Sequence, residues 1–159
     1  MERRAERLGL KNGLVVVIMG SEADFEHAKK IVDTLKELEV QSVLRIASVH
    51  KSTVHLLSMI NDYSRVENLV YVAVAGRSNA LGGVIDANTV KPVISAPPYS
   101  DKYAGADIYS SLRMPSGISA TVAIEPEMAA LAAAKIFALN DPLLAARILE
   151  HQRMLEQKI

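Results

Sequence analysis

The chain has 159 residues, of which 50% are hydrophobic and 23% are charged, and this composition supports one domain with a packed core. Its 18 basic and 18 acidic side chains balance, which argues against a broad cationic surface for nucleic acid or for an anionic membrane. The absence of cysteine excludes disulfides, thiolate metal sites and a cysteine nucleophile, and it fits a reducing compartment such as the cytoplasm.

Residues 1–13 are highly charged and are expected to form a loose N-terminal arm, which leaves residues 14–159 as a single domain. The apolar run from Leu14 to Met19 is typical of a strand that is buried on both faces. It is much shorter than the ~18 residues of a membrane span, and no signal-peptide cleavage site follows it. We therefore expect neither a membrane segment nor a targeting signal.

From this strand onward, extended and helical patterns alternate along the chain. β-Branched runs predict strands, and apolar residues at three- and four-residue spacing predict helices. In chain order, the predicted elements are a strand at 14–19, a helix at 22–38, a strand at 40–47, a helix at 52–63, a strand at 69–75, a helix at 79–88, a strand at 92–96, a helical turn at 105–112, a strand at 119–124, and helices at 126–139 and 142–158. This alternation predicts βαβ units and an α/β fold with a parallel sheet.

Polar residues gather where the predicted strands end. Ligands of an open parallel sheet bind beyond the carboxyl ends of its strands. Small, polar and titratable residues follow the first four predicted strands, at 20–24, 48–52, 76–83 and 97–101. Because these ends meet at one edge of the sheet, we expect the four segments to form the functional site.

The first of these segments begins with Gly20, which allows a tight turn, and Ser21, which is suited to cap the next helix. The N–H groups at such a helix start also suit a phosphate, and an acidic residue such as Asp24 suits the helix dipole. Ordinary N-capping explains the same residues, and the segment matches neither a Walker loop nor the dinucleotide fingerprint.

His50 is the main candidate for acid–base chemistry, because histidine titrates near neutral pH. Lys51 follows it at the start of a predicted helix and adds a cation for a phosphate or carboxylate. The alternative is a loop histidine that only caps the helix. His27, His55 and His151 fall within predicted helices, where surface or packing roles are expected.

The third segment, Gly76-Arg77-Ser78-Asn79 followed by Gly82-Gly83, places small residues and backbone N–H groups at a strand end. A turn followed by close helix–strand packing is the alternative interpretation. No two histidines have a carboxylate at ligand spacing, so no metal site is expected. The chain also lacks the G-x-S-x-G elbow, which argues against a hydrolase triad.

Four segments carry a family resemblance. They are Met19-Gly20-Ser21-x-x-Asp24, Ser48-Val49-His50-Lys51, Ala75-Gly76-Arg77-Ser78-Asn79-Ala80-Leu81-Gly82 and Ser111-Leu112-Arg113-Met114-Pro115-Ser116-Gly117. In this order and spacing the chain resembles the aminoimidazole ribonucleotide carboxylases of purine biosynthesis, from Val15 to the last helix. The resemblance implies a three-layer α/β sandwich with a flavodoxin-like sheet, a long C-terminal helix and a homo-octamer.

The resemblance also implies roles for individual residues. His50 would take the ring proton of aminoimidazole ribonucleotide and return it in the reverse reaction. Ser78 and the N–H of Ala80 would position carbon dioxide, and Arg77 would either contribute there or brace the loop. Lys51 would neutralise the phosphate or the new carboxylate. The substrate-binding set that the resemblance implies is Ser21, Asp24, Ser48, Lys51, Gly76, Arg77, Ser78 and Ala80, with Asp24 on the ribose hydroxyls.

The family has two branches that differ in the third loop. Class I moves a carboxyl group within N-carboxyaminoimidazole ribonucleotide and has a longer loop with a second histidine. Class II uses carbon dioxide directly, without a metal, biotin or ATP. This chain has Ala80 before Leu81 and carries Lys51, as class II does, although Val49 and Ala23 depart from the usual residues. We therefore expect a class II carboxylase with no cofactor. A class I mutase and a non-catalytic phosphoribosyl-binding protein are the alternatives.

The last predicted helix bears on assembly. Leu144, Ile148 and Leu155 lie near one helical face, and the preceding helix is rich in alanine, which allows close approach. A single domain that exposed such a stripe would be expected to associate. The alternative is that this face packs on its own sheet.

Overall fold

The computed structural model describes residues 13–156, so residues 1–12 of the predicted arm and residues 157–159 lie outside the described part. In chain order the elements are β1 (Leu14–Met19), α2 (Phe25–Glu37), β2 (Gln41–Ile46), α3 (Thr53–Tyr63), β3 (Leu69–Val74), α4 (Leu81–Ala87), β4 (Val93–Ser95), α5 (Tyr109–Leu112), β5 (Thr121–Val122), α6 (Pro126–Ala138) and α7 (Pro142–Glu156), with short 3-10 turns at Glu22–Asp24, Asp101–Tyr103 and Ala106–Ile108. No helix in the described residues is both long enough and apolar enough to cross a bilayer.

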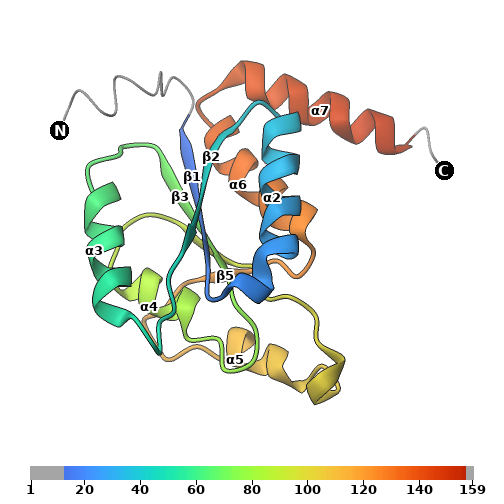
Figure 1. Cartoon of the computed structure of the whole chain (residues 1–159). Coiled ribbons are helices and arrows are strands. Elements are labelled where there is room, and N and C mark those ends of the chain that lie inside the picture. Colours follow the sequence, from blue (N-terminus) through green and yellow to red (C-terminus); the bar gives the residue numbers. More distant parts are fainter. Residues whose placement is uncertain (1–12, 157–159) are drawn as a thin grey trace.

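The five strands are parallel and lie in the order β2-β1-β3-β4-β5. This is the flavodoxin-like strand order. Helices α2, α6 and α7 lie on one face of the sheet, and α3 and α4 lie on the other (Figure 1). The predicted three-layer α/β sandwich is therefore confirmed, and each predicted strand and helix has a counterpart in the structure.

Strand β1 is apolar throughout because both of its faces are covered. Val15 and Val17 belong to the core that β1 shares with α2 and α6. Val16 and Ile18 belong to the second core, which β1 shares with α3 and α4. All residues of β1 and β3 are buried. Burial of each such side chain contributes about 1.5–3 kcal/mol of transfer free energy, so these central strands anchor the domain.

Most element boundaries lie within one to three residues of the prediction, and differences at two places bear on the packing. Gly13, the last residue of the predicted arm, is buried, and a Cβ there would lie 2.7 Å from the ring of Phe137. The predicted strand at 119–124 shortens to Thr121–Val122, and before its start the N–H of Ser119 donates to Asp86 Oδ2 at 2.7 Å. That donor is then absent from the ladder that would extend β5.

Helix α4 approaches the sheet closely at Gly82. A Cβ at Gly82 would overlap the hydroxyl of Ser95 in β4, and Ser95 is fully buried. The alternative interpretation of close helix–strand packing is therefore confirmed at this glycine. Only a residue without a Cβ lets α4 lie this near β4.

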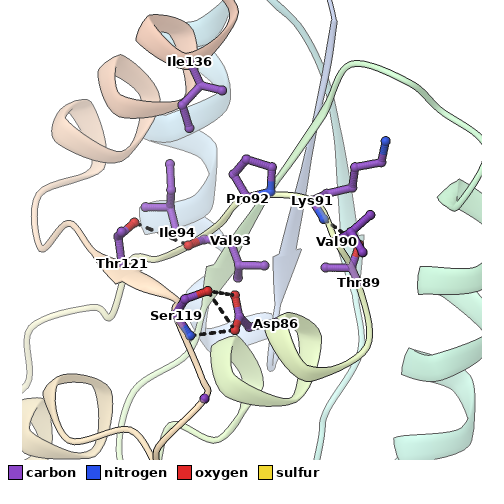
Figure 2. Close-up of a pocket in the computed structure, with 11 residues that line it drawn as sticks. Asp86, Thr89, Val90, Lys91, Pro92, Val93, Ile94, Ser119, Thr121 and Ile136 are labelled. Carbon is purple, nitrogen blue, oxygen red and sulfur yellow. Dashed lines mark hydrogen bonds between the residues drawn. The ribbon is translucent and has the colours of Figure 1, made fainter.

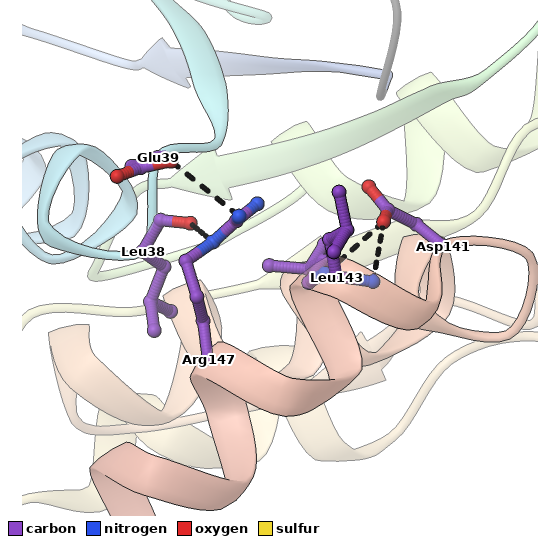
Figure 3. A network of polar contacts seen from close by, with 6 residues as sticks. Leu38, Glu39, Asp141, Leu143 and Arg147 are labelled. Carbon is purple, nitrogen blue, oxygen red and sulfur yellow. Dashed lines mark hydrogen bonds and ion pairs between the residues drawn. The ribbon is translucent and has the colours of Figure 1, made fainter.

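Helix α7 is fixed to the domain at its start (Figure 3). Asp141 Oδ1 accepts a hydrogen bond from the N–H of Leu143 at 3.0 Å and caps the helix, which begins with a proline. Arg147 Nε donates to the carbonyl of Leu38 at 3.0 Å, and Arg147 Nη1 lies 3.4 Å from Glu39 Oε2. A guanidinium at the C-terminal end of α2 also suits the helix dipole.

The face of α7 that was expected to mediate assembly is only partly exposed. Leu144 is 0% exposed and Ile148 is 5% exposed, because both pack into the core of their own domain. The expectation that these two residues form an exposed stripe is wrong. Leu155 is 47% exposed. The other large apolar side chains exposed on α7 are Leu143, Leu149 and Met154.

His27 of α2 packs against the domain rather than standing in solvent. Its side chain is half-buried, and its Nε2 is buried without a hydrogen-bond partner. Burial lowers the pKa of His27. The charge of Glu125 opposes this shift, Lys30 adds to it, and Asp24 and Glu127 oppose it. The neutral imidazole is therefore the form that the fold accommodates.

Acidification is expected to destabilise the protein through His27. The pKa of His27 lies below its ordinary value of 6.5 in the folded state, so the unfolded chain takes up the proton more readily. The contribution of neutral His27 to stability is therefore present near neutral pH, and it is lost as the pH falls from about 7 to about 5. The melting temperature should fall less over this interval in His27→Gln than in the wild type. His55→Gln, at an exposed position on α3, is the control. Equal pH slopes in all three proteins would contradict the assignment.

Candidate active site

The loop after β1 is closed by Ser21 and Asp24. The N–H and the Oγ of Ser21 both donate to Asp24 Oδ2 at 3.0 Å, and the N–H of Asp24 donates to the Ser21 carbonyl at 3.2 Å. The bond from the Ser21 N–H belongs to the capping box that Ser21 and Asp24 form at the start of the 3-10 turn leading into α2. The capping interpretation of Ser21 and Asp24 is confirmed. Asp24 Oδ1 takes no part in the capping box.

The loop after β2 presents His50 and Lys51 on a hydrogen-bonded turn. Ser48 Oγ accepts from the N–H of Lys51 at 3.3 Å, and the Ser48 carbonyl accepts from the N–H of Ser52 at 2.8 Å. Ser52 Oγ accepts from the N–H of Ser48 at 3.1 Å. His50 and Lys51 are both exposed at the tip of this turn. The serines thus hold the backbone, while the titratable side chains face solvent.

The loop after β3 contains an unusual backbone conformation. Arg77 has φ = 57°, in the left-handed region that a side chain with a Cβ rarely adopts. Its N–H donates to Asp107 Oδ2 at 3.2 Å, and Ser110 Oγ lies 2.7 Å from the carbonyl oxygens of both Arg77 and Asp107, which share its one proton. Arg77 and Ser78 are exposed, and Gly76 is half-buried. The segment that includes Asp107 and Ser110 therefore holds Arg77 from both sides.

Asn79 lies beneath this loop and is only 3% exposed. Its Nδ2 donates to Ser111 Oγ at 2.9 Å, and its Oδ1 accepts from the N–H of Leu81 at 3.2 Å. Its backbone N–H donates to Ser110 Oγ at 2.9 Å. Asn79 is therefore a buried brace between the third and fourth motifs. Both ends of its side-chain amide are therefore already paired within the protein.

The N–H of Ala80 is also engaged. It donates to the carbonyl of Ser78 at 2.9 Å. The expectation that this N–H positions carbon dioxide therefore does not match the structure, in which the loop itself uses the donor. The exposed hydroxyl of Ser78 and the side chain of Arg77 are the donors that the loop presents outward.

The strand ends bring these loops together at one edge of the sheet. The N–H of Ala47 donates to the Met19 carbonyl at 3.0 Å, which joins the ends of β1 and β2. The N–H of Gly20 donates to the Val74 carbonyl at 2.9 Å, which joins the ends of β1 and β3. A Cβ at Gly76 would lie 3.6 Å from the carbonyl oxygen in Pro98, after β4. The predicted convergence is confirmed for the backbone of all four segments.

This edge carries the chemistry of proton transfer and anion binding. Its exposed groups include the imidazole of His50, the ammonium of Lys51, the guanidinium of Arg77 and the hydroxyl of Ser78. Two cations and a hydroxyl suit a phosphate or a carboxylate, and the imidazole suits general acid–base work. Within residues 13–156, no three histidine or acidic side chains gather as a metal site would require.

Sequence reasoning missed Asp107 and Ser110, which hold the third loop across about thirty residues. Their segment was predicted only as a helical turn, and neither residue type is distinctive in a polar loop. The one signal was the neighbouring motif that begins at Ser111. Tertiary hydrogen bonds of this kind have no local pattern that a sequence would reveal.

A surface pocket of ≈ 470 Å³ lies elsewhere, beside the starts of β4 and β5 (Figure 2). Val93 and Thr121 line it, and the Asp86 carboxylate accepts hydrogen bonds from the N–H and the hydroxyl of Ser119 there. The amino-terminal ends of parallel strands are remote from the edge that carries His50. This pocket therefore takes no part in the candidate site.

Comparison with known proteins identifies close relatives. The family model for AIR carboxylase matches residues 14–158. A phosphoribosylaminoimidazole carboxylase of Archaeoglobus fulgidus is 49% identical over 157 residues, which are 99% of this chain and 84% of that protein. One from Treponema denticola is 46% identical over 147 residues, covering 92% of each chain.

A solved structure agrees with these matches. The crystal structure of Treponema denticola PurE superimposes with a TM-score of 0.90 at 45% identity, covering 92% of this chain and 93% of that one. The fold, the order of the motifs and the match over nearly the whole domain all lead to the same assignment. The chain belongs to the AIR carboxylase family.

Proposed function

We propose that this protein is a phosphoribosylaminoimidazole carboxylase of the class II type, which joins aminoimidazole ribonucleotide and carbon dioxide to form carboxyaminoimidazole ribonucleotide. The curated relatives that match nearly the whole chain carry the name of this enzyme. The observation that carries the choice of branch is the third loop, which holds no histidine between Gly76 and Gly82 and presents Arg77 and Ser78 outward.

The reaction needs little beyond a proton acceptor and good positioning. The substrate ring is an electron-rich enamine, so its carbon beside the amine attacks the carbon of carbon dioxide and forms a C–C bond. One oxygen of carbon dioxide then carries the negative charge. His50 takes the proton that this ring carbon releases, and the ring regains its aromaticity. Because the ring itself supplies the electrons, the step requires no metal, biotin or ATP.

The remaining residues bind in this proposal. Ser21 and Asp24 hold the ribose phosphate portion, with Asp24 Oδ1 as the acceptor for ribose hydroxyls. Ser48 and Lys51 hold the phosphate or the new carboxylate from the second loop, where Lys51 acts as a point charge.

The third loop then faces carbon dioxide. Gly76, Arg77 and Ser78 line the approach, and the developing oxyanion is stabilised by the donors of Arg77 and Ser78. The bond from the N–H of Ala80 to the Ser78 carbonyl gives Ala80 a structural role in the loop.

An isotope experiment separates the two branches. N-carboxyaminoimidazole ribonucleotide with a labelled carboxyl group is supplied together with a large pool of unlabelled bicarbonate and carbonic anhydrase. Class II chemistry should give mostly unlabelled product, because the substrate first loses its carboxyl group to the pool. Heat-denatured protein measures the spontaneous loss of label.

Two outcomes would overturn this proposal in different ways. Efficient retention of label in the product would mean direct transfer and would move the protein to the class I branch. No product from either nucleotide, with binding retained, would make the protein a non-catalytic phosphoribosyl-binding relative.

We further propose a homo-octamer in the cytoplasm. Exposed apolar residues of α7, including Leu143 and Leu149, would pack against other copies, because association removes exposed apolar side chains from water. Light scattering at micromolar concentration should give about eight times the chain mass of 17.3 kDa. A monomer mass under these conditions would contradict the proposed octamer.

The proposed location in the cytoplasm is supported by the cysteine-free composition, which fits a reducing compartment.

A further inference from the structure

The left-handed conformation of Arg77 needs an external cause. A residue with a Cβ at φ = 57° is disfavoured relative to glycine, and no glycine occupies this position. Strained backbone persists where the surrounding structure holds it, and it often occurs at functional sites. Arg77 and its neighbour Ser78 are the two side chains that the third loop exposes.

The cause lies in a segment thirty residues further along the chain. Asp107 Oδ2 accepts from the N–H of Arg77 at 3.2 Å, and Ser110 Oγ lies 2.7 Å from the carbonyl oxygen of Arg77. The same Ser110 Oγ accepts from the N–H of Asn79 at 2.9 Å. Two side chains thus hold the backbone on both sides of Ser78.

Asp107 and Ser110 are more exposed than Asn79 and Ser111, the buried pair beneath the loop. Asn79 and Ser111 are buried, and a hydrogen bond joins their side chains. Asp107 and Ser110 are half-buried, and their hydrogen bonds to the loop are near the surface. Surface hydrogen bonds stabilise a fold little, so the main consequence of these bonds is the shape of the loop.

We infer that Asp107 and Ser110 are positioning residues for carboxylation, which hold Arg77 in its left-handed conformation and so aim Arg77 and Ser78 at carbon dioxide. This inference rests on the proposed function. It predicts that loss of either side chain impairs the use of carbon dioxide while the nucleotide, bound by the first two loops, binds normally.

The test compares Ser110→Ala with a matched control. Ser119→Ala removes another serine hydroxyl that bonds a residue thirty-three positions away, Asp86, at a distance from the site. Steady-state assays vary carbon dioxide at saturating aminoimidazole ribonucleotide, and calorimetry measures nucleotide affinity without bicarbonate. Ser110→Ala should lower kcat/KM for carbon dioxide about 10- to 100-fold, because misplacement of a positioned group costs this much. Ser119→Ala should keep wild-type kinetics at a similar melting temperature.

Conservative variants complete the test. Ser110→Thr keeps a hydroxyl and Asp107→Asn keeps a carbonyl acceptor, so both should recover most of the rate that Ser110→Ala and Asp107→Ala lose. If Ser110→Ala does not fold, the comparison of Asp107→Ala with Asp107→Asn tests the inference by the same measurements. Unchanged kinetics, or an equal loss in Ser119→Ala, would overturn the inference. The inference would also be overturned if weaker nucleotide binding in the alanine variants accounted for their whole loss of kcat/KM.

These outcomes are separate from failure of the proposed function. If the wild type binds aminoimidazole ribonucleotide and carboxylates it, but Ser110→Ala and Asp107→Ala do so equally well, only the positioning role is wrong. If the wild type itself does not carboxylate this nucleotide, the proposed function is wrong, and the positioning role falls with it.

Discussion

Replacing His50 with asparagine is expected to lower the carboxylation rate about 100- to 10,000-fold, because asparagine cannot act as a general base. The fold should be unaffected, since His50 is exposed and the turn around it is held by Ser48 and Ser52. Steady-state kinetics with saturating nucleotide measure the loss in kcat. Circular dichroism should show the wild-type spectrum.

His55 provides the control for this substitution. It is exposed on α3, five residues after His50, and no role in the reaction is proposed for it. His55→Asn should retain wild-type kcat. If His50→Asn kept more than about a tenth of wild-type activity, the ring proton would need another acceptor.

Replacing Asn79 with alanine is expected to lower the free energy of unfolding by about 2–6 kcal/mol. The substitution leaves two buried groups unpaired, the Ser111 hydroxyl and the N–H of Leu81. Each unpaired buried group costs about 1–3 kcal/mol. The melting temperature should fall by roughly 5–15 °C for a domain of this size. Differential scanning calorimetry at one fixed protein concentration measures the change.

Asn88 is the matched control for Asn79. Its Nδ2 also makes one hydrogen bond, to the Val84 carbonyl at 2.8 Å, but the residue is exposed at the end of α4. Asn88→Ala should cost less than about 1 kcal/mol, because water replaces the lost partner. Equal destabilisation by the two substitutions would mean that Asn79 does not brace the loop.

The exposed apolar face of α7 shows a limit of pattern analysis. Leu144, Ile148 and Leu155 share a helical periodicity, but periodicity alone does not say which partner covers the face. The structure buries Leu144 and Ile148 within the domain and leaves Leu155 exposed. Arg147 contributes to this choice, because its bond to the Leu38 carbonyl sets the side of α7 that meets α2.

The sequence by itself determined the parallel α/β architecture and the edge at which the site lies. Residues 14–19 and 69–74 are apolar throughout, which is typical of a strand covered on both faces, and polar residues such as Ser21 and His50 follow the strands closely. These are local patterns of hydrophobicity and turn chemistry, so they are visible without the fold.

Only the tertiary structure decided how the third loop is held and which of its donors face outward. Arg77 is left-handed because Asp107 and Ser110 bond its backbone, and Asn79 points inward because Ser111 and the N–H of Leu81 pair with it. Each of these contacts except that to Leu81 joins residues about thirty positions apart. A hydrogen bond between distant residues depends on where the folded backbone places two ordinary polar groups, and neither group carries a sequence pattern that names its partner.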